Sequence, residues 1–286
     1  MIENINWYPG HMKKTREMIA ANLKLVDVVV EVVDARIPVS SRNPIIDEIV
    51  KNKRRIIVLN KSDLSDPDEN RKWSEHFTKA GSKCLIMNCN SGEGVKKLLS
   101  LLEREQEDIN SHRNVPKPLR MMIVGVPNVG KSSLINRLTG RKATQTGDKP
   151  GVTKGKQWLT LSNNMQLMDT PGVLWPKFED PEVGLDLAFC GSIKDEILDI
   201  ADLALELIKF LYDNYPDMLM ARYKLEELPE DTMEAPYALG TMEAIALKRG
   251  FIMPGKRIDY ERCGKTVLDE FRSGTIGKIT LERLND

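Results

Sequence analysis

Short apolar runs alternate with helix-like stretches in the first part of the chain. Residues 27–35, 54–60, 84–90 and 120–125 are rich in apolar residues, and each run ends in a polar or glycine-bearing turn. Stretches with helical periodicity follow them, such as GVKKLLSLLEREQ. Strands that alternate with helices form a parallel sheet with helices on both faces. The pattern therefore predicts an α/β fold with a mostly parallel sheet.

The pattern changes at about Leu185. Two further strands, expected to be antiparallel, are KQWLTLS and MQLMDT, and beyond them strand-like alternation does not return. DEILDIADLALELIKFLYDNY instead carries apolar residues at helical spacing. We expect two domains: an α/β domain at residues 1–178 and an all-helical C-terminal domain at residues 179–286.

Charge and cysteine content narrow the partners and the compartment. The 42 Lys and Arg residues balance the 42 Asp and Glu residues, so attraction to nucleic acid must come from local patches. No apolar run approaches the ~20 residues that cross a bilayer, and the N-terminus lacks the apolar core of a signal peptide. The four cysteines form no CxxC pair, which is typical of reduced thiols. We expect a cytoplasmic protein without a membrane or DNA partner, and a monomer because no coiled-coil seam is evident.

A phosphate-binding loop follows the apolar run at 120–125. Gly125, Gly130, Lys131 and Ser132 fit the G-x-x-x-x-G-K-[ST] pattern between a strand and a helix. Glycines let backbone N–H groups surround phosphates, and the helix N-terminus adds positive partial charge. Lys131 is expected to reach the β- and γ-phosphates, and Ser132 to bind Mg²⁺. The same stretch carries three more residues expected to contact the nucleotide: Asn128, Val129 and Ser133.

The tetrapeptide NKSD, which begins at Asn60, indicates which base is bound. It resembles the N-K-x-D motif, in which Asp63 accepts hydrogen bonds from the guanine N1–H and exocyclic amino group. Adenine lacks the N1–H, so a carboxylate here would lose its partner and reject adenine. Asn60 is expected to hold neighbouring loops, and Lys61 to pack along the base. Together with the phosphate loop, the motif predicts a site for GTP.

The segment DTPG and the polar stretch before it resemble the switch regions of GTPases. Asp169 is expected to bind Mg²⁺ through water, and the Gly172 N–H to contact the γ-phosphate. Thr153 in GDKPGVTKG is our candidate for the threonine that completes Mg²⁺ coordination. Thr146, and after it Thr144, are the alternatives.

A second guanine-binding motif lies in NCNSGEG, at the end of the run at 84–90. In GTPases the backbone of the corresponding loop contacts guanine O6. Asn88 and Cys89 stand where many GTPases have Ser and Ala. Only the backbone role is therefore carried over to Asn88, Cys89 and Asn90.

The order of these motifs is unusual. NKSD and NCNSG precede the phosphate loop and DTPG follows it, whereas the phosphate loop comes first in the usual GTPase. This circular permutation is physically allowed because all the loops leave the carboxyl edge of one sheet. It also joins DTPG to the C-terminal domain through a short link, so nucleotide state can be passed to that domain.

Four features together resemble the circularly permuted ribosome-assembly GTPases, and in particular the ribosome biogenesis GTPase A group. They are the permuted order, WYPGHMKK near the N-terminus, DARIPVSSRNP after the first strand and GKITLERL near the C-terminus. The resemblance covers essentially the whole chain. It implies a GTPase that binds a late precursor of the bacterial large ribosomal subunit, promotes its maturation and leaves after hydrolysis. We expect slow turnover alone and faster turnover on the ribosomal particle.

The group that orients the attacking water is not the usual glutamine, because Val173 and Leu174 follow DTPG. The family resemblance points to His11, whose imidazole can hydrogen-bond water near neutral pH. The alternative role of His11 is to cap or pack the first helix. Asn128 is the candidate for holding K⁺, as in GTPases that share this asparagine, and its alternative role is to shape the phosphate loop.

The C-terminal domain carries a local excess of basic residues that could neutralise rRNA phosphates. They are Lys248, Arg249, Lys256, Arg257, Arg262, Lys265, Arg272, Lys278 and Arg283. The alternative is a solvated helical surface, and only the family resemblance favours RNA. Lys265 and Lys278 are the named candidates for RNA contacts.

Two functions of different classes follow from these expectations. The first is an enzyme, a GTPase that acts as a timed switch in large-subunit assembly. The second is an rRNA-binding placeholder in which nucleotide only tunes affinity and hydrolysis is incidental. The role of His11 separates them, because only the first function requires hydrolysis for release.

Overall fold

The fold comes from a computed structural model, in which the described residues form two compact units. Of these residues, those from 178 to 281 belong to the helical unit, and those from 17 to 175 and from 282 to 284 belong to the α/β unit. The described residues are 17–140, 158–161, 163–168, 170, 172, 174–175, 178, 180–231 and 236–284.

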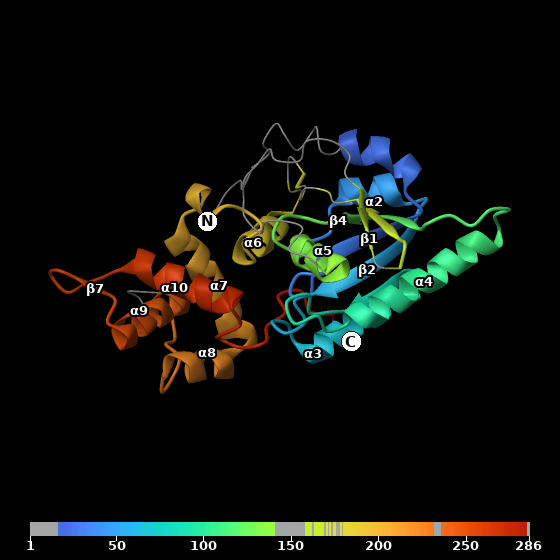
Figure 1. The fold of residues 1–286 in the computed structure, drawn as a ribbon. Coiled ribbons are helices and arrows are strands. Elements are labelled where there is room, and N and C mark those ends of the chain that lie inside the picture. The colour runs from blue at the N-terminus through green and yellow to red at the C-terminus, as the bar shows by residue number, and fades with distance from the viewer. Residues whose placement is uncertain are drawn as a thin grey trace. The chain divides into compact units, whose positions relative to one another are not determined.

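A six-stranded sheet forms the centre of the described α/β unit, in the order β3-β2-β1-β4-β6-β5 (Figure 1). The strands are β1 (Val28–Asp34), β2 (Arg54–Asn60), β3 (Lys83–Ile86), β4 (Arg120–Val124), β5 (Trp158–Thr160) and β6 (Gln166–Met168). All neighbouring pairs are parallel except β5 with β6, which is antiparallel. The expected mostly parallel sheet is confirmed.

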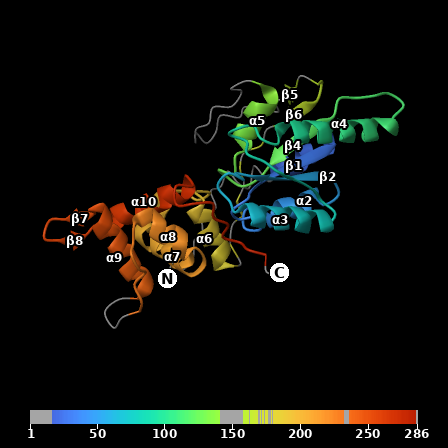
Figure 2. The same ribbon diagram turned by 90° about the horizontal axis from the view of Figure 1, so that it is seen from below.

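Helices cover both faces of the sheet. They are α2 (Pro44–Val50), α3 (Pro67–Lys79), α4 (Val95–Ser111) and α5 (Lys131–Thr139), with a short 3-10 helix, η1 (Leu23–Leu25), before β1. Figure 2 shows α2 and α3 on one face and α4 and α5 on the other. All seven residues of β1 are buried, because this central strand is covered from both sides.

Local sequence signals fix where the helices of the α/β unit begin. The Asn43 side chain accepts a hydrogen bond from the Ile45 N–H, and the Asp66 side chain accepts from the N–H groups of the first turn of α3. Proline occupies the first position of both helices, where its missing N–H costs nothing. These caps place the turns that leave β1 and β2, which are the turns closest to the NKSD motif.

The helical unit is built from α6 (Pro181–Phe189), η2 (Asp195–Ile197), α7 (Ile200–Asn214), α8 (Pro216–Tyr223), α9 (Tyr237–Arg249) and α10 (Tyr260–Arg272). One side of α7 is buried through Leu203, Leu207 and Leu211, as the helical spacing of apolar residues predicts. Within the described ranges, no helix combines the length and the apolar content that a bilayer crossing requires.

The helical unit is not entirely helical. A short hairpin pairs β7 (Ile252–Met253) with β8 (Arg257–Ile258) between α9 and α10. Gly255 and Lys256 adopt positive φ in the connecting turn, which lets this short loop reverse the direction of the chain. The expectation of an all-helical domain therefore needs this correction, because a strand of two residues is too short to show alternation.

The contact of α10 with α7 depends on the small size of Gly264. A Cβ added at Gly264 would lie 2.9 Å from the Ile200 carbonyl oxygen and 3.1 Å from the Ala204 Cβ. Backbone atoms cannot move aside cheaply, so a side chain here would force the two helices apart.

We expect Gly264→Ala to lower the free energy of unfolding of the helical unit by about 1–3 kcal/mol, as overpacking does. Gly240→Ala in α9 is the control, because its added Cβ meets only ring carbons of Pro229, at 3.2 Å and beyond, and no backbone atom. Chemical denaturation followed by circular dichroism measures both variants. Equal stability of the two would show that the α7–α10 contact tolerates a methyl group.

Candidate nucleotide-binding site

The sheet brings the loops that follow its parallel strands to one edge. NKSD begins at the end of β2, NCNSG follows β3, and the phosphate loop follows β4. Thr170 and Gly172 of DTPG follow β6, which is parallel to β4. The sheet order reverses between β1 and β4, and ligands of such sheets bind at the carboxyl ends of the strands at this point.

The phosphate loop is shaped by two glycines that no other residue could replace without strain. Gly125 has a φ of +153°, and a Cβ there would lie 2.4 Å from the Val32 carbonyl oxygen. Gly130 has a φ of +100°, and its Cβ would lie 2.1 Å from the Asn60 Nδ2. The loop therefore packs directly against β1 and against the first residue of NKSD. Helix α5 begins at Lys131, so its free N–H groups face the inside of this loop.

Lys131 and Gly172 lie together at the phosphate loop. The Lys131 Nζ donates a hydrogen bond to the Val126 carbonyl oxygen at 2.6 Å, so the ammonium group lies along the inside of the loop. A Cβ on Gly172 would lie 2.9 Å from this Nζ and 2.8 Å from the Pro127 backbone nitrogen. The structure thus brings DTPG to the phosphate loop, with space for no side chain at Gly172. Ser132 and Ser133 are half-buried in the first turn of α5.

The Asn60 side chain joins three of the loops. Its Nδ2 donates to the Val129 carbonyl oxygen at 2.7 Å, and its Oδ1 accepts from the Cys89 N–H at 2.9 Å. The Asn60 carbonyl oxygen also accepts from the Ala35 N–H at 2.8 Å. Asn60 is almost fully buried, so these hydrogen bonds satisfy a polar group that water cannot reach.

Lys61 is held by a buried carboxylate at the end of β1. The Lys61 Nζ lies 2.9 Å from the Asp34 Oδ2, and Lys61 adopts a positive φ of 62°. The Arg36 guanidinium binds the same carboxylate with two hydrogen bonds, at 3.0 and 2.8 Å. Burial opposes ionisation of Asp34, but Arg36 and Lys61 together hold its pKa well below the usual range.

Asp63 and Cys89 belong to the two guanine-binding motifs, whose loops lie side by side. Asp63 is exposed on the turn after β2. Burial is the main reason that the pKa of Cys89 is raised to about 12, with Arg137 opposing the shift and the Asp63 carboxylate adding to it. The Ser62 N–H donates to the Met87 carbonyl oxygen at 3.2 Å, so NKSD lies beside the residue that precedes NCNSG.

Arg137 on α5 holds the NCNSG loop in place. Its Nε donates to the Cys89 carbonyl oxygen at 3.1 Å, and its Nη2 donates to the Asn90 carbonyl oxygen. The Asn88 side chain accepts from the N–H groups of Asn90 and Ser91, at 2.9 and 3.1 Å, which closes the turn of the loop on itself. Asn88 therefore has a structural role here, and Asn90 is exposed.

Sequence reasoning missed Asp34, Arg36 and Arg137 as supports of the site. Asp34 and Arg36 belong to DARIPVSSRNP, a segment that contributed to the family resemblance but was assigned no role in the site. Arg137 had no signal, because an arginine in an amphipathic helix usually faces solvent.

Several expected site residues lie outside the described residues. They are His11, Thr153 with its alternatives Thr146 and Thr144, and Asp169. Val173, which stands where many small GTPases have glutamine, lies outside them as well. Asn128 is described and is exposed at a φ of +60°. The roles of these residues stay predictions.

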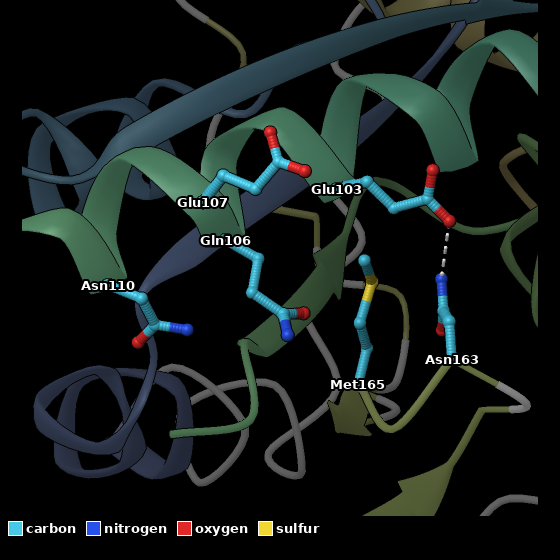
Figure 3. A pocket seen from close by; sticks show the side chains of 6 residues that line it. All are labelled: Glu103, Gln106, Glu107, Asn110, Asn163 and Met165. Atoms are coloured by element: carbon cyan, nitrogen blue, oxygen red, sulfur yellow. Dashed lines mark hydrogen bonds between the residues drawn. The ribbon is translucent and has the colours of Figure 1, made fainter. Parts of the chain in front are cut away.

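A separate pocket of about 230 Å³ lies between α4 and the strands β5 and β6 (Figure 3). Glu103, Gln106, Glu107 and Asn110 line it from α4, with Asn163 and Met165 opposite. Asn163 and Met165 precede β6, so the pocket lies at the amino edge of the sheet, away from the motifs. Its two carboxylates would repel phosphates, so it does not suit a nucleotide.

The arrangement defines a class of protein. A glycine loop at a helix N-terminus provides backbone N–H groups and a lysine for phosphates. Two loops whose motifs resemble those that bind guanine are tied to it through Asn60, and they come earlier in the chain. This is the site of a circularly permuted P-loop GTPase.

Comparison with known proteins places the chain within that class. Residues 120–235 match the family described as 50S ribosome-binding GTPase. Ribosome biogenesis GTPase A of Priestia megaterium is 46% identical over 97% of this chain and 96% of that protein. The solved structure of GNP-bound YlqF from T. maritima has a TM-score of 0.65 and 29% identity, over 94% of this chain and 98% of that one. A GDP-bound structure of YlqF has a TM-score of 0.64 at 28% identity, over 94% of this chain and 100% of that one.

The chain belongs to the ribosome biogenesis GTPase A family, and it is a GTPase. The resemblance expected from the motifs is thereby confirmed, and so is the permuted GTPase fold.

The two glycines that flank α5 provide a matched test of the phosphate loop. We expect Gly130→Ala to introduce about 2–3 kcal/mol of strain and to weaken GDP binding by about a hundredfold. Gly140→Ala also has a positive φ, of +63°, but its Cβ would meet nothing within 4 Å. Fluorescence titration with labelled GDP measures both, and Gly140→Ala should bind as the wild type does. Similar affinities for the two variants would show that the Gly130–Asn60 contact does not shape the site.

The Asp34 carboxylate also predicts the behaviour of the protein in acid. Its pKa is lowered from 3.8 on folding, so its stabilising contribution is present above pH 3.8 and is lost as the pH falls further. We expect the free energy of unfolding to decrease with acidification below that pH, and to depend less on pH there in Asp34→Asn. Urea denaturation between pH 2 and pH 6 measures this. Asp108→Asn is the control, because Asp108 pairs with Arg54 at the exposed surface, where solvent screens the pair.

Proposed function

We propose that this GTPase binds GTP at the carboxyl edge of the sheet and hydrolyses it to drive a late step in assembly of the large ribosomal subunit. The observation that carries the proposal is the Asn60 side chain, which joins the phosphate loop at Val129 to the second guanine motif at Cys89. This contact supports one continuous site for phosphates and base. The names of the relatives support ribosome assembly as the process.

The base is bound between the two guanine motifs. Asp63 accepts hydrogen bonds from the guanine N1–H and amino group, and Lys61 packs along the base. The backbone of Asn88, Cys89 and Asn90 contacts guanine O6. The exposure of Asp63 supports this role, because its carboxylate is accessible to a ligand.

The phosphates are bound by the loop from Asn128 to Ser133, with Lys131 supplying positive charge. Mg²⁺ fits this site because α5 offers a serine hydroxyl at its N-terminus, where metal and phosphate are bound in P-loop proteins. Ser132, Thr153 and, through water, Asp169 would hold it. The ion would neutralise charge on the β- and γ-phosphates. Gly172 senses the γ-phosphate through its N–H, which is supported by its position against Lys131.

Hydrolysis requires a group that orients water. His11 takes this role in the proposal, because no glutamine follows DTPG. Asn128 holds K⁺, since its exposed side chain lies on the phosphate loop at a positive φ. If hydrolysis drives release, His11→Ala should stall the protein on its particle with GTP bound. If the protein is instead a placeholder, this variant should mature particles normally.

The helical unit contacts rRNA in this proposal. Arg249 and Arg272 are used inside the unit, where they pair with Glu270 and Asp195. Other basic residues are exposed and accessible to phosphates, among them Lys256, Arg257, Lys265 and Lys278. Arg257 and Lys256 extend from the β7–β8 hairpin, so the hairpin is the first place to look for RNA contacts.

The two units have separate tasks in this proposal. The α/β unit binds and hydrolyses GTP, and the helical unit binds rRNA. Phe178, where the helical unit begins, follows DTPG by a few residues, which supports transmission of nucleotide state. The protein acts as a monomer in the cytoplasm, where large-subunit precursors are assembled.

The first test is GTP turnover at fixed K⁺ and Mg²⁺, with and without purified large ribosomal subunits. We expect the subunits to raise turnover on the order of tenfold or more, since a switch must be ordered before water is aligned. ATP should not be hydrolysed under either condition. Tight GTP binding with no stimulation by subunits or by precursor particles would contradict the proposed switch.

A further inference from the structure

The end of the chain returns to the α/β unit. The helical unit ends at Leu281, and residues 282–284, which we call the C-terminal clip, pack on the α/β unit. The Trp73 Nε1 donates to the Glu282 carbonyl oxygen at 2.8 Å, and the Leu284 N–H donates to the Glu69 carboxylate at 2.9 Å. The Leu284 side chain packs against the core cluster that contains Trp73 and Phe77. The clip is therefore anchored by both backbone and side-chain contacts.

The Glu282 carboxylate binds one loop. It accepts hydrogen bonds from the Val39 N–H, from the Ser40 N–H at 2.7 Å and from the Ser40 hydroxyl. These donors lie in the segment 35–43 after β1, which we call the β1 loop. Successive backbone N–H groups that face one anion form a strong and specific anchor, because the charge strengthens each hydrogen bond.

The β1 loop in turn fixes the carboxylate that holds Lys61. The Asp34 N–H donates to the Ser41 hydroxyl oxygen at 3.0 Å, and the Arg36 N–H donates to the Asp34 Oδ1 at 3.1 Å. The Asp34 carboxylate then binds the Lys61 ammonium at 2.9 Å. An unbroken series of contacts thus runs from the clip through the β1 loop to NKSD.

We propose that Glu282 is a positioning residue for guanine-nucleotide binding. By binding the β1 loop it keeps Asp34 in the position that orients Lys61 against the base. The inference rests on the proposed contact of Lys61 with guanine.

The clip directly follows residues that are anchored in the helical unit. Thr280 is anchored in that unit, since its carbonyl oxygen accepts from the Tyr215 hydroxyl at 3.0 Å, and Ile279 is buried there. Only Leu281 separates Thr280 from Glu282, so the connection between the anchored residue and the clip is one residue long.

The test is equilibrium binding of labelled GDP to the full-length protein. We expect Glu282→Ala to weaken binding by about tenfold and to raise KM for GTP while kcat at saturation is retained. Glu282→Gln, which keeps one of the two acceptor oxygens, should recover part of the loss. Glu270→Ala is the matched control, because it removes a carboxylate bound by Arg222 within the helical unit and should leave GDP affinity unchanged.

A double-mutant cycle separates positioning from general stabilisation. If Glu282 acts through Asp34, Glu282→Ala combined with Asp34→Asn should bind GDP no more weakly than Asp34→Asn alone. Additive losses, or wild-type affinity in Glu282→Ala, would overturn the inference. Asp63→Ala tests the proposed site independently: if that variant still binds GDP normally, the site itself is wrong. A melting temperature above the assay temperature confirms folding of each variant, and Glu282→Gln replaces Glu282→Ala if the latter fails.

Discussion

The site depends on one buried amide. Asn60 lies at the end of β2, and its donor and acceptor atoms point to different loops, so neither can rotate without loss of a hydrogen bond. Its carbonyl oxygen holds a third loop at Ala35. Because water does not reach Asn60, each broken contact would leave a buried polar group unsatisfied. Loops that are far apart in the sequence are therefore kept in one geometry by a single side chain.

This dependence explains how the motifs can occur in permuted order. A nucleotide contacts the ends of strands, and the ends of parallel strands share an edge in any order of connection. What must be preserved is the contact between the guanine motif and the phosphate loop, which Asn60 provides across the sheet. The residues before the phosphate loop thus carry the two motifs that we propose bind the base.

Much of the fold could be predicted because its signals are local. Val- and Ile-rich runs identify β1, β2 and β4, and the caps Asn43 and Asp66 mark helix starts. The glycine spacing of the phosphate loop and the NKSD tetrapeptide are also local, and the family they indicated is confirmed. The positions of these residues at one edge followed from the parallel sheet alone.

The supports of the site could not be predicted in the same way. Lys61 pairs with Asp34 across neighbouring strands, and Arg137 reaches the carbonyl groups of a loop that precedes it by almost fifty residues. No periodicity encodes contacts of this kind. The β7–β8 hairpin was not predicted for a different reason: its strands are too short to show an alternation of apolar and polar residues. Sequence patterns reveal surfaces and ends of elements, but not which side chains meet across them.

The clip has a consequence for how the protein is made. Val39 and Glu282 are separated by 243 positions, so their contact is among the most non-local in the molecule. During translation the β1 loop is made long before Glu282, with the helical unit between them. The β1 loop therefore gains its carboxylate partner only after the helical unit has been synthesised. A nascent chain that has not yet reached Glu282 lacks this support for Asp34.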